Sequence, residues 1–479
     1  MTDERYRSPL GTRYSSPAMQ RLWGEPHRIA LWRQLWLALA ESERELGIGI
    51  PDEAIAALKA HLGDADLEAA AKYERRFRHD VMAHVHHLGD QAPEARPFIH
   101  LGATSCFVTD NADCIIVRDA LRLCLGRLVA VMDLLGAFAA RHAGLPCLAY
   151  THFQPAQLTT VGKRATLWLQ DFAMDAAEVA HRLATLRARG CKGTTGTQAS
   201  FLELFDGNDA KVRELDARVT HRMGFDASFP VTGQTYSRKQ DAVVLDALSG
   251  MAQSAAKMAN DLRLLQHEGE LLEPFESDQI GSSAMAYKRN PMRAERIGAL
   301  ARFVISLQAN GAHTAAAQWL ERTLDDSANR RLTLPEAFLS VDAILILVTN
   351  IVAGLEVREP VIARHVAEQM PFMATERWLM LGVERGGDRQ TLHEVVRRHS
   401  LAVADAVASG RANDLLERLS NDPAFSGVPG EQLRAELDPA RYTGRAEAQV
   451  HDFLRETIQP LLDQLRPLAA TPDSAEVRV

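Results

Sequence analysis

The sequence predicts an all-α protein in which smaller helical domains stand before and after a central bundle of long helices. Apolar residues recur at helical spacing along most of the 479 residues. Proline is absent from the interior of the long periodic segments, where each proline would cost about 3 kcal/mol. No strand-rich region, internal repeat or low-complexity tract interrupts this pattern.

The N-terminal part of the chain predicts several ordinary helices. Residues 28–46 form an amphipathic pattern that Gly47 ends, and Pro51 starts a second short helix. Residues 64–100 are richer in charge and histidine, and they predict short helices joined by turns. The pattern changes near Thr109, where long periodic segments begin.

The middle of the chain carries long segments that share the helical period. They are 110–142, 156–190, 238–270, 292–320 and a shorter one at 335–356. At about 1.5 Å per residue, helices of this length run roughly 45 Å. Such helices need one another's apolar faces, so we expect a bundle.

Beyond Pro360 the pattern shortens again, and residues 360–465 predict ordinary helices joined by Gly, Asp and Pro turns. The small, polar tail from about Ala469 is expected to be frayed. These changes predict an N-terminal domain over 1–108, a bundle domain over 109–358 and a C-terminal domain over 359–479.

The charge balance is acidic, with a net charge of −8. A general nucleic-acid or membrane-surface role would need a basic excess, although a local cationic pocket for an anion stays open. No apolar signal core opens the chain, and no uninterrupted apolar run of roughly 18 residues predicts a membrane span.

The cysteine pattern argues against metal and disulfide frameworks. The five cysteines form no CxxC pair, and their number is odd. We therefore expect neither a disulfide framework nor a structural zinc site, but reduced thiols in the cytoplasm.

The polar segment Gly281–Pro291 is the first candidate for chemistry. Hydroxyl groups of Ser282 and Ser283 precede Lys288 and Asn290 closely, and Pro291 can start the next helix. Hydroxyl, cation and amide donors together suit an anion that forms during a reaction. By composition alone, a polar loop that ends in a helix cap is the simpler explanation.

The segment Tyr150–Pro155 is the second candidate. Pro155 suits the first turn of a helix, which predicts His152 at the entrance of the following long helix. Histidine is a natural proton donor near neutral pH, although a single histidine is more often structural.

Three further segments carry charges or hydroxyls. Arg78–His87 lacks convincing ligand spacing for zinc, so anion contacts by Arg78 and His79 fit better. Glu321–Arg331 can hold a phosphate or carboxylate near Ser327, or it can be a solvated helix end with internal ion pairs. Lys192–Ser200 lacks the spacing of a nucleotide P-loop, so an ATPase is rejected, while a flexible hydroxyl-rich loop over a ligand stays open.

In this order, the segments resemble those of the fumarase/aspartase superfamily of lyases, and within it the adenylosuccinate lyase family of the animal type. The segments that carry the resemblance are Arg13–Tyr14, Arg78–His84, His100–Ser105, Thr151–Lys163, Lys192–Phe201, Thr232–Tyr236, Gly281–Pro291 and Glu321–Arg331. The resemblance runs from about Arg5 to about Leu465. Its extent makes it specific, whereas any single segment would identify only the superfamily.

The resemblance implies the fumarase/aspartase-like fold and a β-elimination. Adenylosuccinate would yield AMP and fumarate, and the succinyl-aminoimidazole-carboxamide ribotide of purine synthesis would be cleaved in parallel. The resemblance also implies a homotetramer with active sites shared between subunits, and no metal or organic cofactor. Nucleic acid and membrane are not expected partners.

The resemblance assigns roles as well. Ser282 is the expected base, Lys288 its activating cation, and His152 the acid that protonates the departing nitrogen. Glu295 is expected to orient a histidine, for which His79 is the candidate. Positions for substrate contact match Arg13, Tyr14, Arg78, Asp80, Thr104, Ser105, Thr151, Gln234, Asn290, Arg296, Arg322, Ser327 and Arg331. Loop amides from Ser282 to Met285, with Asn290, are expected to hold the developing charge.

One departure and several alternatives accompany this interpretation. The family usually has proline where this chain has Ala286, which predicts a less preorganised loop. Only the family match selects Ser282 over Ser283 as the base. A sister lyase that acts on argininosuccinate, fumarate or aspartate, a non-catalytic structural protein on the same scaffold, and a helical interaction scaffold are the alternatives.

Overall fold

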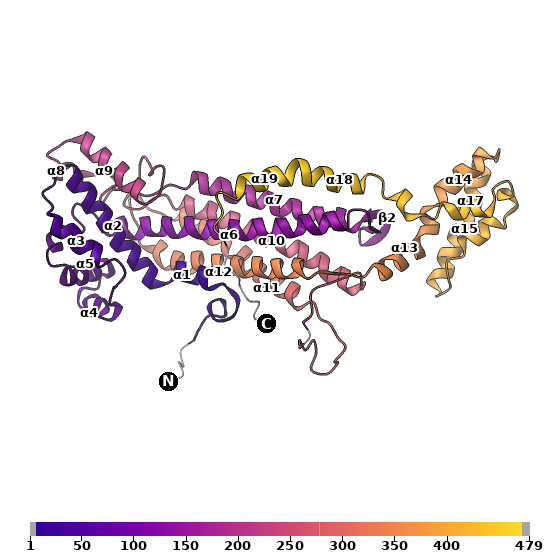
Figure 1. The fold of residues 1–479 in the computed structure, drawn as a ribbon, viewed down its shortest axis with the longest axis horizontal. Coiled ribbons are helices and arrows are strands. Elements are labelled where there is room, and N and C mark those ends of the chain that lie inside the picture. Colours follow the sequence, from indigo (N-terminus) through magenta and orange to yellow (C-terminus); the bar gives the residue numbers. More distant parts are fainter. Residues whose placement is uncertain (1–5, 277, 472–479) are drawn as a thin grey trace.

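Long antiparallel helices dominate the computed structural model, which describes residues 6–276 and 278–471 (Figure 1). The bundle consists of α6 (Ser105–Arg141), α7 (Val161–Thr185), α10 (Lys239–His267), α11 (Met292–Ala316) and α12 (Asp325–Ala353). The predicted all-α fold with a long central bundle is confirmed.

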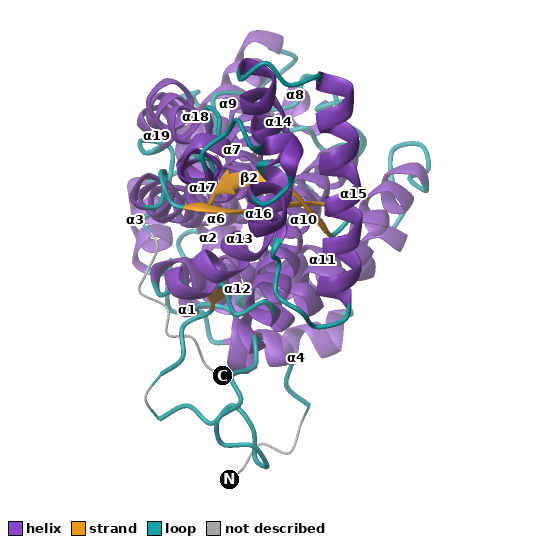
Figure 2. Cartoon of the chain, turned by 90° about the vertical axis from the view of Figure 1, so that its right-hand side faces the viewer, coloured by secondary structure: helices purple, strands orange, loops and turns teal. Residues whose placement is uncertain are grey.

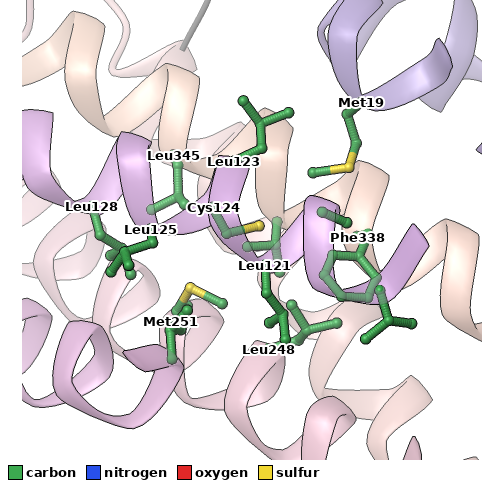
Figure 3. Packing of buried hydrophobic residues seen from close by; sticks show 14 of the residues in the cluster. Met19, Leu121, Leu123, Cys124, Leu125, Leu128, Leu248, Met251, Phe338 and Leu345 are labelled. Carbon is green, nitrogen blue, oxygen red and sulfur yellow. The ribbon is translucent and has the colours of Figure 1, made fainter. Parts of the chain in front are cut away.

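The bundle core is made of side chains that project from several helices toward one another. Figure 3 shows such residues from α6, α10 and α12, all 0% exposed: Leu121, Leu125, Leu128, Leu248, Met251, Phe338 and Leu345. Burial of each large aliphatic side chain contributes roughly 1.5–3 kcal/mol to the stability of the fold, so the shared core holds the bundle helices together.

Two bundle helices have the length and composition of membrane spans. Windows in α6 and α12 reach mean hydropathies of 1.8 and 1.9. These windows are 67% and 72% buried inside the protein, and core helices have the same length and composition. The sequence prediction considered only uninterrupted apolar runs and did not identify these two windows.

Short helices form one end of the molecule, on the left in Figure 1. They are α2 (Glu25–Glu45), α3 (Asp52–Ala60), α4 (Leu67–Phe77), α5 (Asp80–Gln91) and η2 (Arg96–Phe98), joined there by α8 (Ala199–Leu204) and α9 (Asp209–Arg222). The preceding η1 (Leu10–Tyr14) and α1 (Pro17–Trp23) lie beside the bundle, where the Ser16 amide between them donates to Asp342 on α12 at 2.6 Å. The helices predicted at 28–46 and after Pro51 correspond to α2 and α3.

The opposite end carries a second hydrophobic cluster, formed within residues 374–433. Its elements are α13 (Glu359–Met373), α14 (Thr375–Glu384), α15 (Arg389–Ala408), α16 (Leu415–Ser420), η3 (Pro423–Phe425), α17 (Gly430–Ala435) and η4 (Pro439–Tyr442). Figure 2 shows the chain from this end. Then α18 (Ala446–Phe453), η5 (Leu454–Ile458) and α19 (Gln459–Leu465) return along the bundle, where Val450 and Leu462 join its core. Most of the tail predicted to fray, residues 472–479, lies outside the described residues.

The prediction of a helix from residue 156 was wrong at its start. Residues 146–160 form an antiparallel hairpin of β1 (Pro146–Thr151) and β2 (Gln154–Thr160), and α7 begins only at Val161. Thr160 caps that helix by accepting a hydrogen bond from the Lys163 amide at 3.1 Å. Pro155 therefore lies in a strand, which is tolerated because each strand of a two-stranded sheet is an edge strand.

The last bundle helix also differs from the prediction. Instead of a shorter helix from 335, α12 begins at Asp325 and contains Pro335 in its interior. Proline removes the hydrogen bond to the carbonyl four residues earlier, here that of Arg331, but Arg331 is exposed and its carbonyl can meet water. A second small sheet pairs β3 (Leu271–Leu272) with β4 (Glu356–Val357).

Candidate active site

The predicted site residues fall into three groups on separate parts of the chain. One lies where α6, α10 and α12 begin, another at the tip of the β1–β2 hairpin, and a third in the loop that precedes α11 (Figure 1). The 37 residues of α6 separate the first group from the hairpin, which corresponds to about 55 Å of helix. One chain therefore does not gather all three groups around a single nucleotide-sized ligand.

The first group begins with four side chains in contact. His79 caps the N-terminus of α5 by accepting from the Met82 amide, and its Nε2 lies 3.2 Å from the Ser105 hydroxyl at the start of α6. Arg331 on α12 donates to Asp80 at 3.1 Å. Thr104 is the residue before α6, and Arg78 ends α4 with a left-handed backbone (φ 56°). The structure thus brings the 78–80 and 104–105 segments to the start of α12.

Gln234 and Arg322 extend this group. The Gln234 amide donates to the Glu321 carbonyl at 2.9 Å, and the Cys106 thiol donates to the Gln234 side chain at 3.7 Å. Gly233 permits this approach, because a Cβ there would lie 2.5 Å from the Glu321 carbonyl oxygen. Arg322 donates to Asp326 at 2.7 Å, and Ser327 is half-buried one residue further along α12.

Buried charges that the sequence reasoning missed support the first group. Arg238 pairs with Asp110 and Asp326. Arg189 is 0% exposed and donates to the carbonyls of Gln234, Gly190 and Gly193. Burial alone would raise the pKa of Asp110, but the charge of Arg238 holds that pKa below its ordinary value. No local sequence signal distinguishes these charges from solvated ones.

The loop Lys192–Ser200 lies beside the same group. Gly196 touches the 232–233 backbone so closely that a Cβ would lie 1.8 Å from the Thr232 carbonyl oxygen. Lys192 is buried and pairs with Asp216 at 2.6 Å, so its charge is engaged inside the protein. The hydroxyl-bearing Thr194, Thr195 and Thr197 are exposed.

His84 of the 78–87 segment has structural surroundings. His84 is buried, and its ring meets the Trp32 ring edge-on at 5.5 Å. Burial lowers the pKa of His84 to about 4, which keeps it neutral near pH 7. Among the residues that the structure describes, no cluster of His, Cys, Asp and Glu could hold a metal ion. All five cysteines are buried and unpaired.

The second group is the hairpin tip. Thr151 pairs with Gln154, and the two residues between them, His152 and Phe153, have φ values of 53° and 56°. Two positive φ angles in a two-residue loop are those of a type I′ turn, which presents His152 at an exposed tip. The prediction that His152 lies at a helix entrance is therefore wrong. Arg164 on α7 donates to the Leu148 carbonyl and lies over the Tyr150 ring, which ties the hairpin to the bundle.

The third group is the loop 276–291. The Ser282 hydroxyl oxygen accepts from the amides of Ala284 at 3.3 Å and Met285 at 3.1 Å. Amide donors directed at an oxygen favour its anionic form, so this geometry assists a serine alkoxide. Asn290 donates to the Gly281 carbonyl at 2.6 Å. In this conformation, three of the donors expected to hold substrate charge, the Ala284 and Met285 amides and the Asn290 side chain, are engaged within the loop.

The loop is anchored at its base by Glu273, which is buried, and by Gln266, which is half-buried. Glu273, which follows β3, accepts from the amides of Arg293 and Ala294 at 3.0 Å each and so caps α11. Gln266 on α10 accepts from the Glu273 amide and donates to the Arg289 carbonyl. The start and end of the loop are therefore attached to the same few groups, and residues 283–289 between them are exposed, whereas Gly281 is buried and Ser282 is half-buried.

A groove of about 610 Å³ runs between this loop and the last turns of α10. Three predicted site residues line it, Lys288, Asn290 and Glu295. So do Asn260, Arg263, Gln266 and His267, which sequence reasoning did not select because they continue an ordinary helical pattern. Its volume suits a small-molecule ligand.

The last predicted residues lie near the start of α11. The Arg296 guanidinium lies 5.2 Å from the Tyr14 ring centroid, and Arg13 is exposed beside Tyr14 in η1. Glu295 and His79 belong to different groups, and His79 contacts Ser105 and Met82 instead. The expected pairing of Glu295 with His79 therefore does not occur within one chain.

Comparisons with known proteins cover nearly the whole chain. The family model "Lyase" matches residues 21–306, and "Adenylosuccinate lyase C-terminus" matches residues 371–453. Adenylosuccinate lyase of Saccharomyces cerevisiae is 50% identical, over 96% of both chains, and that of Schistosoma mansoni is 45% identical, over 98% of both.

Solved structures share the fold at lower identity. The 3-carboxy-cis,cis-muconate lactonizing enzyme from Pseudomonas putida superposes with a TM-score of 0.80 at 24% identity, over 96% of this chain and 99% of that one. A fumarate lyase from Mesorhizobium sp. BNC1 has a TM-score of 0.79 at 24% identity, over 93% and 99%. These likenesses concern the fold alone. The sequence relatives show the family: the chain belongs to the adenylosuccinate lyase family.

Proposed function

We propose that this chain cleaves adenylosuccinate to AMP and fumarate, and succinyl-aminoimidazole-carboxamide ribotide to aminoimidazole-carboxamide ribotide and fumarate. The observation that carries the proposal is 50% identity to a named adenylosuccinate lyase over 96% of both chains. The first group adds chemistry that fits, because Arg78, Arg322 and Arg331 gather at one end of an acidic protein. A substrate with one phosphate and two carboxylates needs such donors.

The proposed reaction is a β-elimination with two protein groups at the reacting atoms. Ser282 takes the proton from the succinyl carbon beside a carboxylate, the C–N bond breaks, and His152 protonates the departing nitrogen. A serine is a poor base unless its alkoxide is stabilised. The amides of Ala284 and Met285, already directed at the Ser282 oxygen, and the charge of Lys288 are the groups that would do so.

The backbone at the proposed acid supports an active-site role. Left-handed φ angles are unfavourable for residues with a side chain, by roughly 1–2 kcal/mol. His152 and Phe153 both adopt them, as does Arg78 in the first group. Such strain persists where the surrounding fold imposes it, and it clusters at functional sites.

We further propose a homotetramer in which each active site combines the three groups from different subunits. The length of α6 between the first group and the hairpin is the geometric reason. Large apolar side chains exposed on the bundle helices supply surfaces for such association: Leu167, Met174, Leu264, Phe303 and Leu332. The five unpaired thiols suit a reducing compartment, so we place the enzyme in the cytoplasm.

Incubation of the purified chain with adenylosuccinate tests the activity, with AMP and fumarate measured separately. Both products are expected in equal amounts. Fumarate from argininosuccinate or aspartate instead would favour a sister lyase, and the absence of fumarate from every substrate would favour a structural protein.

A mixing experiment tests the roles and the shared site together. His152→Ala and Ser282→Ala should each nearly abolish turnover while the oligomer persists. Reassembly of the two inactive variants from mixed subunits should restore part of the activity, because some sites then receive both intact residues. Near-normal rates in either variant would refute that residue's role, and no recovery in verified mixed oligomers would refute sharing.

A further inference from the structure

Charged side chains form a continuous row from the surface into the bundle. Arg322 donates from Nη1 to Asp326 Oδ1 at 2.7 Å, and Asp326 Oδ2 accepts from Arg238 Nε at 2.7 Å. Arg238 then donates from both terminal nitrogens to the two oxygens of Asp110, at 3.1 Å each. The side chain of Arg322 is 23% exposed, whereas the other three are 3% exposed or less.

Stability alone does not account for this row. Removing charges from water costs several kcal/mol per ion, and apolar replacements of buried ion pairs are often neutral or stabilising. The row instead fixes the orientation of its side chains. Each oxygen of Asp326 is occupied by a different arginine, and Arg238 also lies over the Tyr236 ring at 4.6 Å, so neither side chain can turn without losing a contact.

The same row also holds the segment that carries Gln234, another predicted substrate contact of the first group. Asp110 also accepts from the Tyr236 amide at 3.1 Å, two residues after Gln234. The Gln234 amide in turn donates to the Glu321 carbonyl, directly before Arg322. One buried network therefore holds both the Gln234 segment and the Arg322 guanidinium.

We propose that Asp326 and Arg238 are positioning residues that aim Arg322 at an anionic group of the substrate. The bond to Asp326 engages one of the five N–H donors of a guanidinium, and the planar fork leaves others for a phosphate or carboxylate. This inference rests on the proposed function, because it assigns a task to a substrate contact of that reaction.

Steady-state kinetics with adenylosuccinate test the proposal through Asp326→Asn. The amide keeps the shape of the carboxylate but presents an NH₂ group to one of the two arginines. We expect KM to rise at least about tenfold with kcat within about threefold, the pattern of lost binding that is equal in ground and transition states. Asp325→Asn changes a neighbouring exposed carboxylate outside the row, and its KM should not change.

A double-mutant cycle separates positioning from general destabilisation. If Asp326 acts through Arg322, then Arg322→Gln and the double variant Arg322→Gln/Asp326→Asn should have the same KM. Independent, additive effects would overturn the inference. Arg322→Lys is a second variant, close to the surface, that does not depend on the folding of Asp326→Asn. Lysine cannot fork, so an unchanged KM there would also overturn the inference.

The outcomes distinguish this inference from the proposed function. Wild-type protein that releases no AMP from adenylosuccinate would remove both. Wild-type turnover combined with an unchanged KM in Arg322→Gln or in folded Asp326→Asn would remove the positioning role alone.

Discussion

Asn290 and Gly281 close the base of the 281–291 loop, with the Asn290 side-chain amide 2.6 Å from the Gly281 carbonyl oxygen. The chain crosses itself at the same place, because a Cβ on Gly281 would lie 2.0 Å from the Lys288 carbonyl oxygen. Only glycine fits that approach. The serine and the lysine of the loop are therefore placed relative to each other through one backbone contact.

Gly281→Ala should disable the loop without unfolding the bundle. The added methyl group must displace the Lys288 backbone, and misplacement of a catalytic group by about 1 Å can lower the rate about 100-fold. We expect a fall in kcat of that order, measured by fumarate release, with little change in the thermal midpoint. Gly63→Ala is the matched control, since nothing lies within 4 Å of a Cβ there. Equal activity of the two variants would contradict the crossing as the reason for glycine.

Ala286→Pro should make the loop better preorganised. The Lys288 amide donates to the Met285 carbonyl at 3.0 Å, so Ala286 occupies the second position of a β-turn, where proline is favoured. A proline that fits the native backbone stabilises the folded conformation by about 0.4–1 kcal/mol, because it restricts the unfolded chain. If the open loop behaves like an unfolded segment, the same free energy favours the closed loop and raises kcat/KM by up to about fivefold.

Ala284→Pro is the opposite control in the same loop. The Ala284 amide donates to the Ser282 hydroxyl, and proline has no N–H to donate. We expect kcat to fall in this variant. A gain in both variants, or a loss in both, would show that the turn assignment does not explain the effect.

Glu273→Gln should loosen the loop from its base. Both carboxylate oxygens accept helix amides, whereas glutamine would direct an NH₂ group at one of them. A buried amide without an acceptor costs about 1–3 kcal/mol. We expect a lower thermal midpoint and faster proteolysis within residues 276–291. Glu359→Gln, an exposed position, should change neither measurement.

The bundle could be predicted from sequence because its signal is long. Segments such as 238–270 repeat the apolar period many times, so their helices appear within a few residues of the predicted bounds. The hairpin at 146–160 has no such signal. Its strands are short, Pro155 resembles a helix start, and His152 with Phe153 replaces the usual Asn-Gly of a type I′ turn.

In the site, too, features within one short segment could be predicted, whereas contacts between residues far apart in the sequence could not. The loop around Ser282 and the polar segments at 78–80 and 321–331 are visible as local composition. In the row from Arg322 to Asp110, directly hydrogen-bonded residues lie as far apart as 128 positions in the sequence, and nothing in the neighbourhood of Arg238 indicates burial. Pairing between such positions depends on how the helices pack, which single-sequence patterns do not contain.

Glu43 gives a prediction about stability against pH. Its side chain is 0% exposed, both oxygens are buried without a hydrogen-bond partner, and burial raises its pKa from 4.5 to about 9. Between these values the folded state keeps a proton that the unfolded state loses. The free energy of unfolding therefore decreases as pH rises through this range, by at most about 1.4 kcal/mol per pH unit for one group.

Glu43→Gln should reduce that dependence, because an amide of the same shape stays neutral at every pH in the range. Its thermal midpoint should fall less between about pH 6 and about pH 8.5 than the wild-type midpoint does. The comparison of slopes matters here, since the unpartnered polar group is buried in both proteins at either pH. Glu53→Gln, an exposed change on the neighbouring helix α3, should retain the wild-type slope. A slope in Glu43→Gln as steep as that of the wild type would show that Glu43 is ionised in the folded protein.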